Sequence, residues 1–573
     1  MSRLSFPAAL ADSSNAVGRY WHFAPIVALL IISLYIAFIV TTDNTNLGTT
    51  NGLWKTPSVS AWEHGGSVPP DSGGFLYYPS YGLIARLIPD RLVQYGTESP
   101  VVTFRKMAIL NAIFGGAASG LVVLLALRFS NSLAVAFLVA AAHAGGGFVL
   151  LNSVNSEDII PAYTFFLGAT VCFFEFLHRA QPWLLHAATL LFALATLFHW
   201  TVMIPGLAAF GAVLVIIMMR EKSYIPLGAV WLFLFSCALQ ILVLLYFPRW
   251  HIPVWAVLIP AKAGASGWLG LNAEKVRLAV LGIGNYFSGA NNSANYRTAL
   301  EGGQLGTLTL SWLYFLTTMG AAVAVLFARR TALASKCLAA FALVLLGVGE
   351  AGALYAQPQD PQLQIQPLFA TVAGLILLAR PGSPSPTPLR RVMTGLFLAV
   401  ALANGFSNAA SLRRGSVGGD RRSLAAVQEL GALFPKDDTA VLSQGFEGWT
   451  TWQFVIQWHG DRVHFDQKNI ALSDVFLSNR GISGADAATL MKRRIDGAFA
   501  AGLRVVSAAL WTETPQQFCA SMNAVADENR VLVYDSILRA SYHTGRVWKT
   551  RLGPFVEILS AEGAHAGTRG TER

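Results

Sequence analysis

The sequence predicts a polytopic α-helical membrane protein with about eleven transmembrane helices and a C-terminal extracytoplasmic α/β domain. Hydrophobic residues make up 54% of the 573 residues and charged residues only 13%, a balance typical of a chain that lies mostly in lipid. Long apolar stretches recur through residues 25–410, and most approach the roughly 20 residues that cross a bilayer. Lys and Arg gather on alternate connections between these stretches, which predicts their orientation.

Eleven apolar stretches meet the expectation for spanning helices. They occupy residues 25–42, 107–127, 132–151, 159–177, 184–198, 202–219, 226–246, 308–327, 334–354, 364–379 and 391–409. The first has basic flanks but no small-residue cleavage site followed by a soluble chain, so we expect a retained helix rather than a signal peptide.

Basic residues predict which connections face the cytoplasm. With residues 1–24 inside, the cytoplasmic connections carry Arg128, Arg179, Arg220, Lys222, Arg329, Arg330, Lys336, Arg380, Arg390 and Arg391. Most carboxylates outside the C-terminal domain fall on the opposite connections. An odd number of spans then places the chain after residue 410 outside the cytoplasm, as in a multi-pass protein of the cell inner membrane.

Two external connections are long, and long ordered loops usually carry function. Residues 43–106 form the first and residues 247–307 the second. The first contains FLYYPSYGLIARLIP at 75–89, which has the spacing of an amphipathic segment lying along the interface. Residues 273–287 of the second resemble another such segment. Together they predict a sheltered groove that is open to the bilayer and to a lipid chain.

The C-terminal region, residues 411–560, changes to an alternation of helices and strands after a polar linker. Helices are expected at 421–434, 449–459, 485–501 and 515–528, and strands at 439–445, 461–466, 503–510 and 530–537. This alternation predicts a parallel sheet with helices on its faces. No Gly-rich phosphate fingerprint follows a strand, so nucleotide binding has no support. Residues 561–573 are expected to be disordered.

Charge and cysteine content exclude several classes of function. The net charge of +10 is largely explained by the cytoplasmic connections, so the sequence predicts no nucleic-acid partner. Three of the four cysteines lie inside expected spans, and no disulfide framework or metal-thiolate spacing is present.

Carboxylates at the external rim are the candidate catalytic and binding groups. They are Asp43, Asp71, Glu157, Asp158 and Asp360. Each has an ordinary alternative role, such as solvating a helix end, forming a turn or capping a helix. Their occurrence in four clusters on one side of the membrane favours a site over four separate structural roles.

Basic residues and one histidine are expected on the same face. Lys262 and Arg297 in the second long loop either anchor it at the headgroups or hold a phosphate. His199, between the fifth and sixth spans, is a further candidate binding residue, although a lone histidine there is more often a satisfied interface residue.

The topology resembles the GT-C superfamily of integral membrane glycosyltransferases. The resemblance rests on an acid soon after the first span, two long external loops and an external C-terminal domain, over about residues 20–410. Locally, Asp43 followed by FLYYPSYGLIARLIP is similar to the polyprenyl-phosphate-mannose-dependent mannosyltransferases. The chain departs from the pattern because Asn44, not a second acid, follows Asp43, which leaves Asp43, Asp71 and, behind them, Glu63 as candidate bases.

The resemblance implies a polyprenyl-phosphate sugar donor and a glycan, lipid or protein acceptor. Asp43 or Asp71 would be the general base, while Arg297 and Lys262 would stabilise the departing phosphate. Glu157 and Asp158 would bind sugar or acceptor hydroxyls. Cationic side chains can neutralise the leaving group, so no metal is expected, although a rim of carboxylates could hold Mg²⁺ or Mn²⁺.

Two other classes of function remain open from the sequence. A multi-spanning envelope transporter would need ionisable residues and discontinuous helices at the midplane, and the spans contain few such residues, chiefly Glu175, His143 and His186. A non-catalytic envelope glycan assembly protein would leave the carboxylates as solvated loop residues.

Overall fold

The structure is a computed structural model. It describes residues 20–42, 59–66, 76–93, 101–156, 158–179, 181–221, 305–329, 331–355, 361–380, 429–435, 438–443, 469–473, 475–476, 479, 481–522, 526–551 and 553–560, and a few residues within 276–279 and 392–413. The chain divides into two compact units. The first comprises residues 1–93 and 103–416, and the second comprises residues 94–102 and 417–573.

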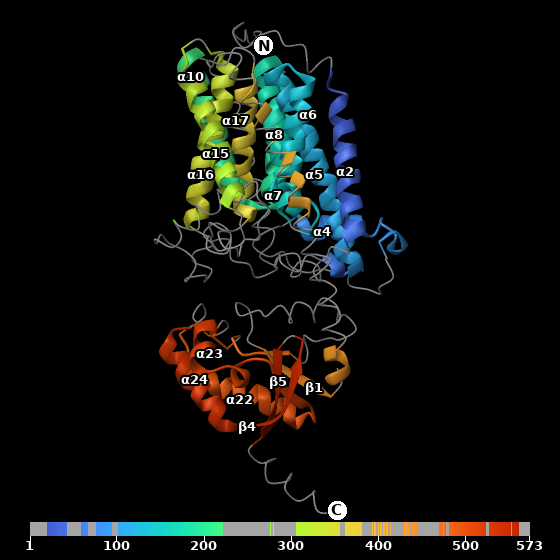
Figure 1. Ribbon diagram of the computed structural model, residues 1–573, viewed down its shortest axis with the longest axis vertical. Coiled ribbons are helices and arrows are strands. Elements are labelled where there is room, and N and C mark those ends of the chain that lie inside the picture. The colour runs from blue at the N-terminus through green and yellow to red at the C-terminus, as the bar shows by residue number, and fades with distance from the viewer. Residues whose placement is uncertain are drawn as a thin grey trace, which may run out of the picture. The chain divides into compact units, whose positions relative to one another are not determined.

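The first unit is a bundle of apolar helices (Figure 1). Its longer described helices are α2 (Phe23–Thr42), α5 (Val101–Ser130), α6 (Leu133–Gly145), α8 (Ile159–Arg179), α9 (Pro182–Phe198), α10 (Met203–Glu221), α15 (Leu305–Phe327), α16 (Leu333–Tyr355) and α17 (Pro361–Ala379). Short elements join them: α4 (Tyr77–Ala85), η2 (Asp90–Leu92), α7 (Gly147–Ser153) and η3 (Trp200–Val202).

Several of these helices are long and apolar enough to cross a membrane. Among the described residues four single helices qualify, and the bent pair α6 and α7 makes a fifth if it counts as one span. Nine of the expected stretches coincide with a helix or with this bent pair. The expected span at 226–246 lies outside the described residues, as does most of that at 391–409.

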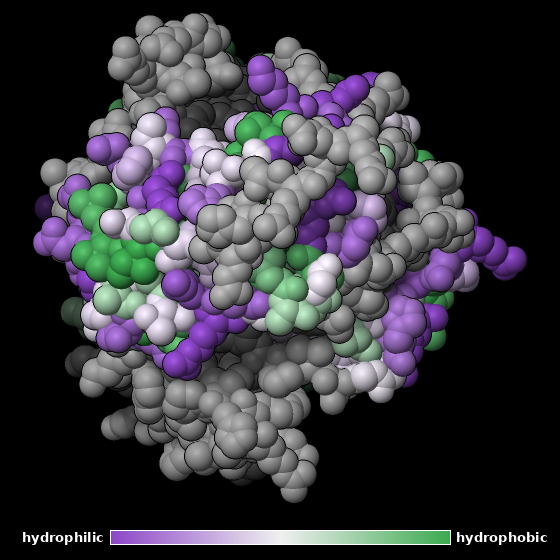
Figure 2. All heavy atoms as spheres, turned by 90° about the horizontal axis from the view of Figure 1, so that it is seen from below, coloured by the Kyte–Doolittle hydropathy of each residue, from purple (hydrophilic) through white to green (hydrophobic). Residues whose placement is uncertain are grey.

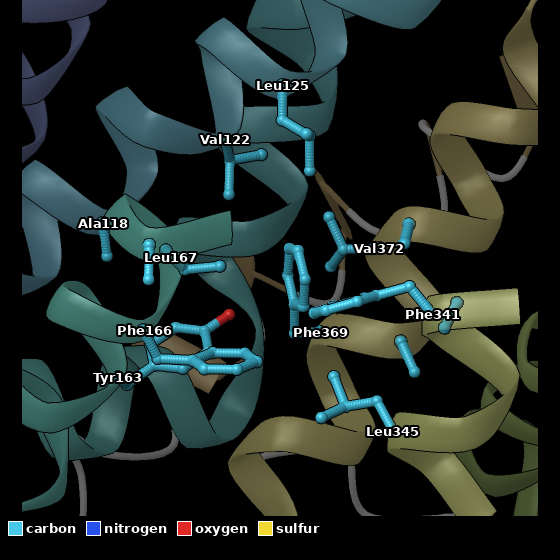
Figure 3. Close-up of a cluster of buried hydrophobic side chains, with 14 of the residues drawn as sticks. Ala118, Val122, Leu125, Tyr163, Phe166, Leu167, Phe341, Leu345, Phe369 and Val372 are labelled. Carbon is cyan, nitrogen blue, oxygen red and sulfur yellow. The ribbon is translucent and has the colours of Figure 1, made fainter. Parts of the chain in front are cut away.

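Aromatic side chains from three helices meet in the core of the first unit. Phe166 of α8 stacks on Phe341 of α16 with ring centroids 6.1 Å apart, and Phe369 of α17 meets both rings edge-on. Figure 3 shows these rings converging among aliphatic side chains of the neighbouring helices. All three rings are fully buried. Close packing of this kind holds helices together where lipid removes the hydrophobic difference between them.

The expected span at 132–151 is not one straight helix. It consists of α6 and α7, which meet at an angle of 67°. The sequence Gly145-Gly146-Gly147 occupies the junction. Glycine weakens a helix and permits a sharp change of direction, which explains the break. The short α7 then leads directly to the connection that carries Asp158.

The two ends of the bundle carry different polar groups. Helices α5 and α8 begin at the end where α2, α7 and α9 finish (Figure 1). At the far ends of α5 and α8, Arg128 donates from Nε to Glu175 at 2.6 Å, and Nε of Arg179 lies 2.8 Å from the same carboxylate. Asp158 immediately precedes α8, so it lies at the opposite end from these arginines.

The second unit contains a five-stranded mixed sheet in the order β2-β1-β3-β5-β4. Its strands are β1 (Thr439–Ser443), β2 (Asn469–Ala471), β3 (Arg504–Ser507), β4 (Tyr542–Thr550) and β5 (Gly553–Ser560). Strand β1 pairs in parallel with β2 and β3, with Val441 opposite Asn469 and Val506. Strand β5 runs antiparallel to both β3 and β4.

Helices pack on both faces of this sheet, because successive strand residues point to opposite sides. Ala440, Leu442 and Val505 contact α22 (Gly484–Ala500), α23 (Pro515–Met522) and α24 (Glu528–Ser541). Val441 and Val506 pack instead with Trp548 and with the helical residues around Phe434. Figure 2, which views the molecule from below, shows hydrophilic side chains over much of the described surface, with smaller apolar areas between them.

The second unit corrects two sequence expectations. The strand expected at 530–537 is wrong, because these residues lie in α24, where Asp527 accepts the N–H of Arg530 as the N-cap. Val531, Tyr534 and Leu538 repeat at helical spacing and are buried. The sheet is also not wholly parallel. The hairpin of β4 and β5 turns at Gly553, whose φ of +112° suits glycine.

The other expected elements of this unit have different outcomes. β1, α22, β3 and α23 coincide in part or whole with elements predicted there. The expected helix at 449–459, strand at 461–466 and tail at 561–573 lie outside the described residues. In the first unit, most of the expected interfacial segment at 273–287 also lies outside them.

Candidate functional site

Asp158 and His199 come together at the end of the bundle where α8 begins and α9 finishes. Nε2 of His199 lies 3.7 Å from Oδ1 of Asp158. Both side chains are buried, Asp158 completely and His199 to within 5% of its surface. A buried carboxylate beside an imidazole is a costly arrangement that proteins retain mainly where charge or hydrogen bonding is used.

Thr201 orients the His199 ring. The Thr201 hydroxyl lies 2.6 Å from Nδ1 of His199, and the Thr201 backbone N–H donates to the same nitrogen at 3.4 Å. A nitrogen that accepts an N–H carries no proton itself, so the imidazole proton is on Nε2, on the side of Asp158. The short η3 turn after α9 therefore holds the ring with Nε2 on the side of Asp158, 3.7 Å from the nearer carboxylate oxygen.

The helix α4 packs against the connection that carries Asp158. The Tyr77 hydroxyl donates to the Ser156 carbonyl at 2.8 Å, and the Tyr81 hydroxyl donates to Oδ1 of Asn111. The amide of Asn111 in turn donates to the Asn155 carbonyl at 2.6 Å. Side chains from α4 and α5 thus fix the backbone of the short connection between α7 and α8.

The electrostatics of Tyr81 reflect its position in this cluster. Burial raises the pKa of the Tyr81 phenol well above its ordinary value, and the negative charge of Asp158 raises it further. The phenol therefore stays protonated at physiological pH and remains a hydrogen-bond donor. Its donation to Asn111 leaves the Asn111 amide group to hold the neighbouring carbonyl.

The outer face of α4 is apolar. Leu83 is 50% exposed and Leu87, just beyond the helix, is 79% exposed, whereas Tyr77 and Tyr81 are fully buried. This two-sided pattern coincides with the amphipathic segment expected over residues 75–89. Helix α4 therefore separates an apolar outer surface from a polar interior.

A buried lysine holds two parts of the first long connection against α5. Nζ of Lys106 lies 2.5 Å from Oε1 of Glu63 and 2.6 Å from Oδ1 of Asp90. Thr103 donates its hydroxyl to the other Glu63 oxygen at 2.8 Å, and Arg86 donates to the Glu63 carbonyl at 2.9 Å. Glu63 is thus engaged in an ion pair, an arrangement that favours a structural role over the role of a general base.

Only some of the predicted site residues lie in the part of the chain that the structure describes. It brings Asp158 and His199 together, as expected for groups on one face. The other candidates lie outside the described residues: Asp43, Asp71, Glu157, Asp360, Lys262 and Arg297. The roles predicted for these six residues stay predictions. The described residues contain no group of three or more His, Cys, Asp or Glu side chains that could hold a metal ion.

Sequence reasoning missed Asn111, Lys106 and the two tyrosines of α4. A signal was present for Asn111 and Lys106, because each is a polar residue at the start of an otherwise apolar span. Tyr77 and Tyr81 belong to the amphipathic segment expected along the interface, and their hydroxyls point inward to hydrogen-bond partners that this pattern does not predict.

The arrangement can bind and orient polar groups of a substrate beside an apolar surface. Asp158 is an acceptor for hydroxyl groups, and His199 can donate to it or exchange a proton with a bound group. The exposed apolar residues Leu83 and Leu87 suit a hydrocarbon chain. Fold and site thus define a helical membrane protein with a polar site at one end of its bundle.

A similar fold occurs in a solved crystal structure. The chain is similar to the crystal structure of ArnT from Cupriavidus metallidurans bound to undecaprenyl phosphate, at 12% identity and a TM-score of 0.50. The match covers 94% of this chain and 98% of ArnT. The apo state of the same protein gives 11% identity and a TM-score of 0.48, over 95% and 98% of the two chains.

At 12% identity, the match shows a fold shared with ArnT. No model of a protein family matches the chain, and no curated protein matches it. The described fold and the ArnT match therefore define the architecture.

Proposed function

We propose that the protein is an integral membrane glycosyltransferase that moves a sugar from a polyprenyl-phosphate-linked donor to an acceptor hydroxyl. The fold shared with ArnT supports this class of enzyme, and the undecaprenyl phosphate bound to ArnT supports this class of donor. The acceptor is a glycan, a lipid or a protein. The site faces the extracytoplasmic side of the cell inner membrane, with the N-terminus in the cytoplasm and the C-terminal domain outside.

The buried pair of Asp158 and His199 is the observation that carries the proposal. Its two residues lie on different connections between apolar helices, and the connection that carries Asp158 packs against α4, whose outer face is apolar. A lipid-linked sugar has the same division, with an isoprenoid chain attached to a polar head. Asp158 accepts hydrogen bonds from hydroxyl groups of the sugar or acceptor, and His199 keeps the carboxylate oriented.

The reaction forms a bond between the acceptor oxygen and the anomeric carbon of the sugar. The bond between that carbon and the phosphate oxygen breaks, and the acceptor proton passes to a carboxylate. Asp43 or Asp71 is the proposed general base, which contributes roughly 10²- to 10⁴-fold to the rate. Arg297 and Lys262 stabilise the departing phosphate. Glu157 and Asp360 join Asp158 in binding hydroxyl groups, and no metal is required.

The proposal is tested by release of undecaprenyl phosphate, a product common to every sugar donor. Purified protein in nanodiscs is incubated with a panel of undecaprenyl-phosphate pentoses and hexoses and with envelope extract as the source of acceptors. We expect release from at least one donor. We expect a loss of about 10²-fold or more in Asp158→Asn and in whichever of Asp43→Asn and Asp71→Asn removes the base.

The matched control is Asp486→Asn, on the exposed first turn of α22 in the second unit, which should leave the rate unchanged. The proposal fails if no donor releases undecaprenyl phosphate, or if all three variants in the first unit act at the normal rate. Broken helices such as α6 and α7 also occur in carriers. Uptake of a labelled solute into proteoliposomes, with no release of undecaprenyl phosphate, would identify a carrier instead.

A further inference from the structure

The break between α6 and α7 lies directly upstream of Asp158. Helix α7 and the residues that follow it lead from Gly146 to the polar site without another element between them. The direction in which α7 leaves the break therefore decides where Asp158 is placed. The contacts at this break have no part in the chemistry proposed above.

Two side chains from distant parts of the chain bind the carbonyls at the break. The Tyr35 hydroxyl of α2 donates to the Ala144 carbonyl at 2.8 Å. The Asn408 amide donates to the Gly145 carbonyl at 2.9 Å. The last carbonyls of a helix have no helical donors of their own. In a membrane an unsatisfied carbonyl is costly, so these two donors stabilise the bent arrangement over a straight one.

Backbone contact at the same point leaves no room for movement. A Cβ atom added to Gly145 would lie 2.8 Å from Cα of Gly405, and one added to Gly405 would lie 3.1 Å from Cα of Gly145. The first distance is shorter than Cβ atoms show in proteins, and the second is tighter than most Cβ contacts. The break is thus packed against the backbone of residue 405, one helical turn before Asn408.

The far end of the bent segment is held as well. Asn111 donates to the Asn155 carbonyl at 2.6 Å, and Tyr77 donates to the Ser156 carbonyl at 2.8 Å. With one clamp at the break and another beside Asp158, the segment between them has a single direction. Removal of the first clamp frees α7 to pivot about the second.

We propose that Tyr35 and Asn408 are positioning residues that set the direction of α7 and so place Asp158 beside His199. The effect of this placement on sugar transfer rests on the proposed function, but the placement itself does not. Neither residue contacts the substrate. They act through the backbone of the bent helix.

Hydrogen–deuterium exchange of the full-length protein in nanodiscs tests the placement without reference to activity. In Tyr35→Phe and in Asn408→Ala we expect amides of residues 147–158 to exchange about fivefold to tenfold faster, the effect of losing one hydrogen bond. Tyr314→Phe removes a buried hydroxyl from α15 and is the matched control, with unchanged exchange in this segment. Unchanged exchange in both clamp variants overturns the proposal. If one variant does not fold, the other variant alone is sufficient for the test.

A double-mutant cycle tests the route through Asp158. Tyr35→Phe alone should lower kcat for release of undecaprenyl phosphate about fivefold to tenfold. Added to Asp158→Asn it should lower kcat no further, because both changes act on one group. If the two changes lower kcat independently, so that their effects multiply in the double variant, the route through Asp158 is overturned. Faster exchange without turnover of any donor would support the placement and refute the glycosyltransferase, whereas turnover with unchanged exchange would do the reverse.

Discussion

Nε2 of His199 lies 3.7 Å from Oδ1 of Asp158, although the two residues belong to different connections of the helical bundle. The Thr201 hydroxyl lies 2.6 Å from the opposite ring nitrogen, Nδ1, so the ring is held with Nε2 toward the carboxylate. Both residues are buried, and their proximity defines the polar site.

Replacement of His199 should slow the reaction without unfolding the protein. In His199→Phe the aromatic ring is kept but the ring nitrogen that lies 3.7 Å from Asp158 is lost, and we expect kcat to fall by about tenfold to a hundredfold. Release of undecaprenyl phosphate measures the rate, and thermal unfolding in nanodiscs measures stability. His186→Phe, on α9 away from Asp158, is the control. An unchanged kcat in His199→Phe would contradict a role for this ring.

Replacement of Lys106 should destabilise the first connection. Lys106→Met removes the ammonium between Glu63 and Asp90, and it leaves the buried Glu63 carboxylate without its counter-charge. Loss of one partner of a buried pair costs roughly 3–5 kcal/mol. Limited proteolysis between residues 59 and 93 measures the effect. The double variant Lys106→Met with Glu63→Gln should recover much of the protection, since the buried charge is then absent.

Arg539 should be required for the stability of the second unit. Its Nε donates to both oxygens of the buried Asp535 at 2.9 Å, and its Nη2 donates to the carbonyls of Leu510 and Glu513. Arg539→Met leaves Asp535 buried and unpaired, at a cost of roughly 3–5 kcal/mol. Exchange of the β3 and α24 amides should then increase. The exposed Arg546→Met, on the edge strand β4, serves as the control.

The stability of the second unit should depend on pH through Glu513. Burial raises the pKa of this carboxyl, the charge of Arg539 opposes the rise, and the charge of Asp535 adds to it. The folded state therefore keeps a proton that the unfolded state releases, so stability falls as pH rises from the ordinary value of 4.5 through the raised value.

Glu513→Gln should remove this pH dependence. The variant is expected to melt at a higher temperature than the natural protein at pH 7.5 and at the same temperature below the ordinary glutamate pKa. Melting followed by exchange of the β3 amides measures both. Glu528→Gln, at the start of α24, is the control. A variant that is less stable at pH 7.5 would show that the charge of Glu513 is used in the fold.

Most of the helices of the first unit could be predicted because their apolar runs have nearly the length of a span. The described helices α2, α5, α8 and α16 begin and end within a few residues of the predicted stretches, since lipid demands an uninterrupted helix. The break at Gly145–Gly146 was not predicted. The bent arrangement is stabilised by hydrogen bonds that Tyr35 and Asn408 donate to its carbonyls, and these two residues lie far away in the sequence.

The site and the second unit were harder to predict from local pattern. Asp158 and His199 were both candidates, but nothing in the sequence pairs residues of different connections. Residues 530–537 were predicted as a strand because β-branched and apolar residues dominate them, whereas the N-cap Asp527 and the sheet packing favour a helix. Glu63 ranked behind Asp43 and Asp71 as a base, and its ion pair with Lys106 gives a physical reason for that order.

The position of Lys106 has a consequence for biogenesis. Glu63 and Asp90 precede it in the chain, so a ribosome delivers both carboxylates before the only described ammonium that pairs with them. Until the start of α5 has emerged, the two carboxylates lack the ammonium that pairs with both of them. The contacts that tie Glu63 and Asp90 to the bundle through Lys106 therefore form only after the start of α5 has been synthesised.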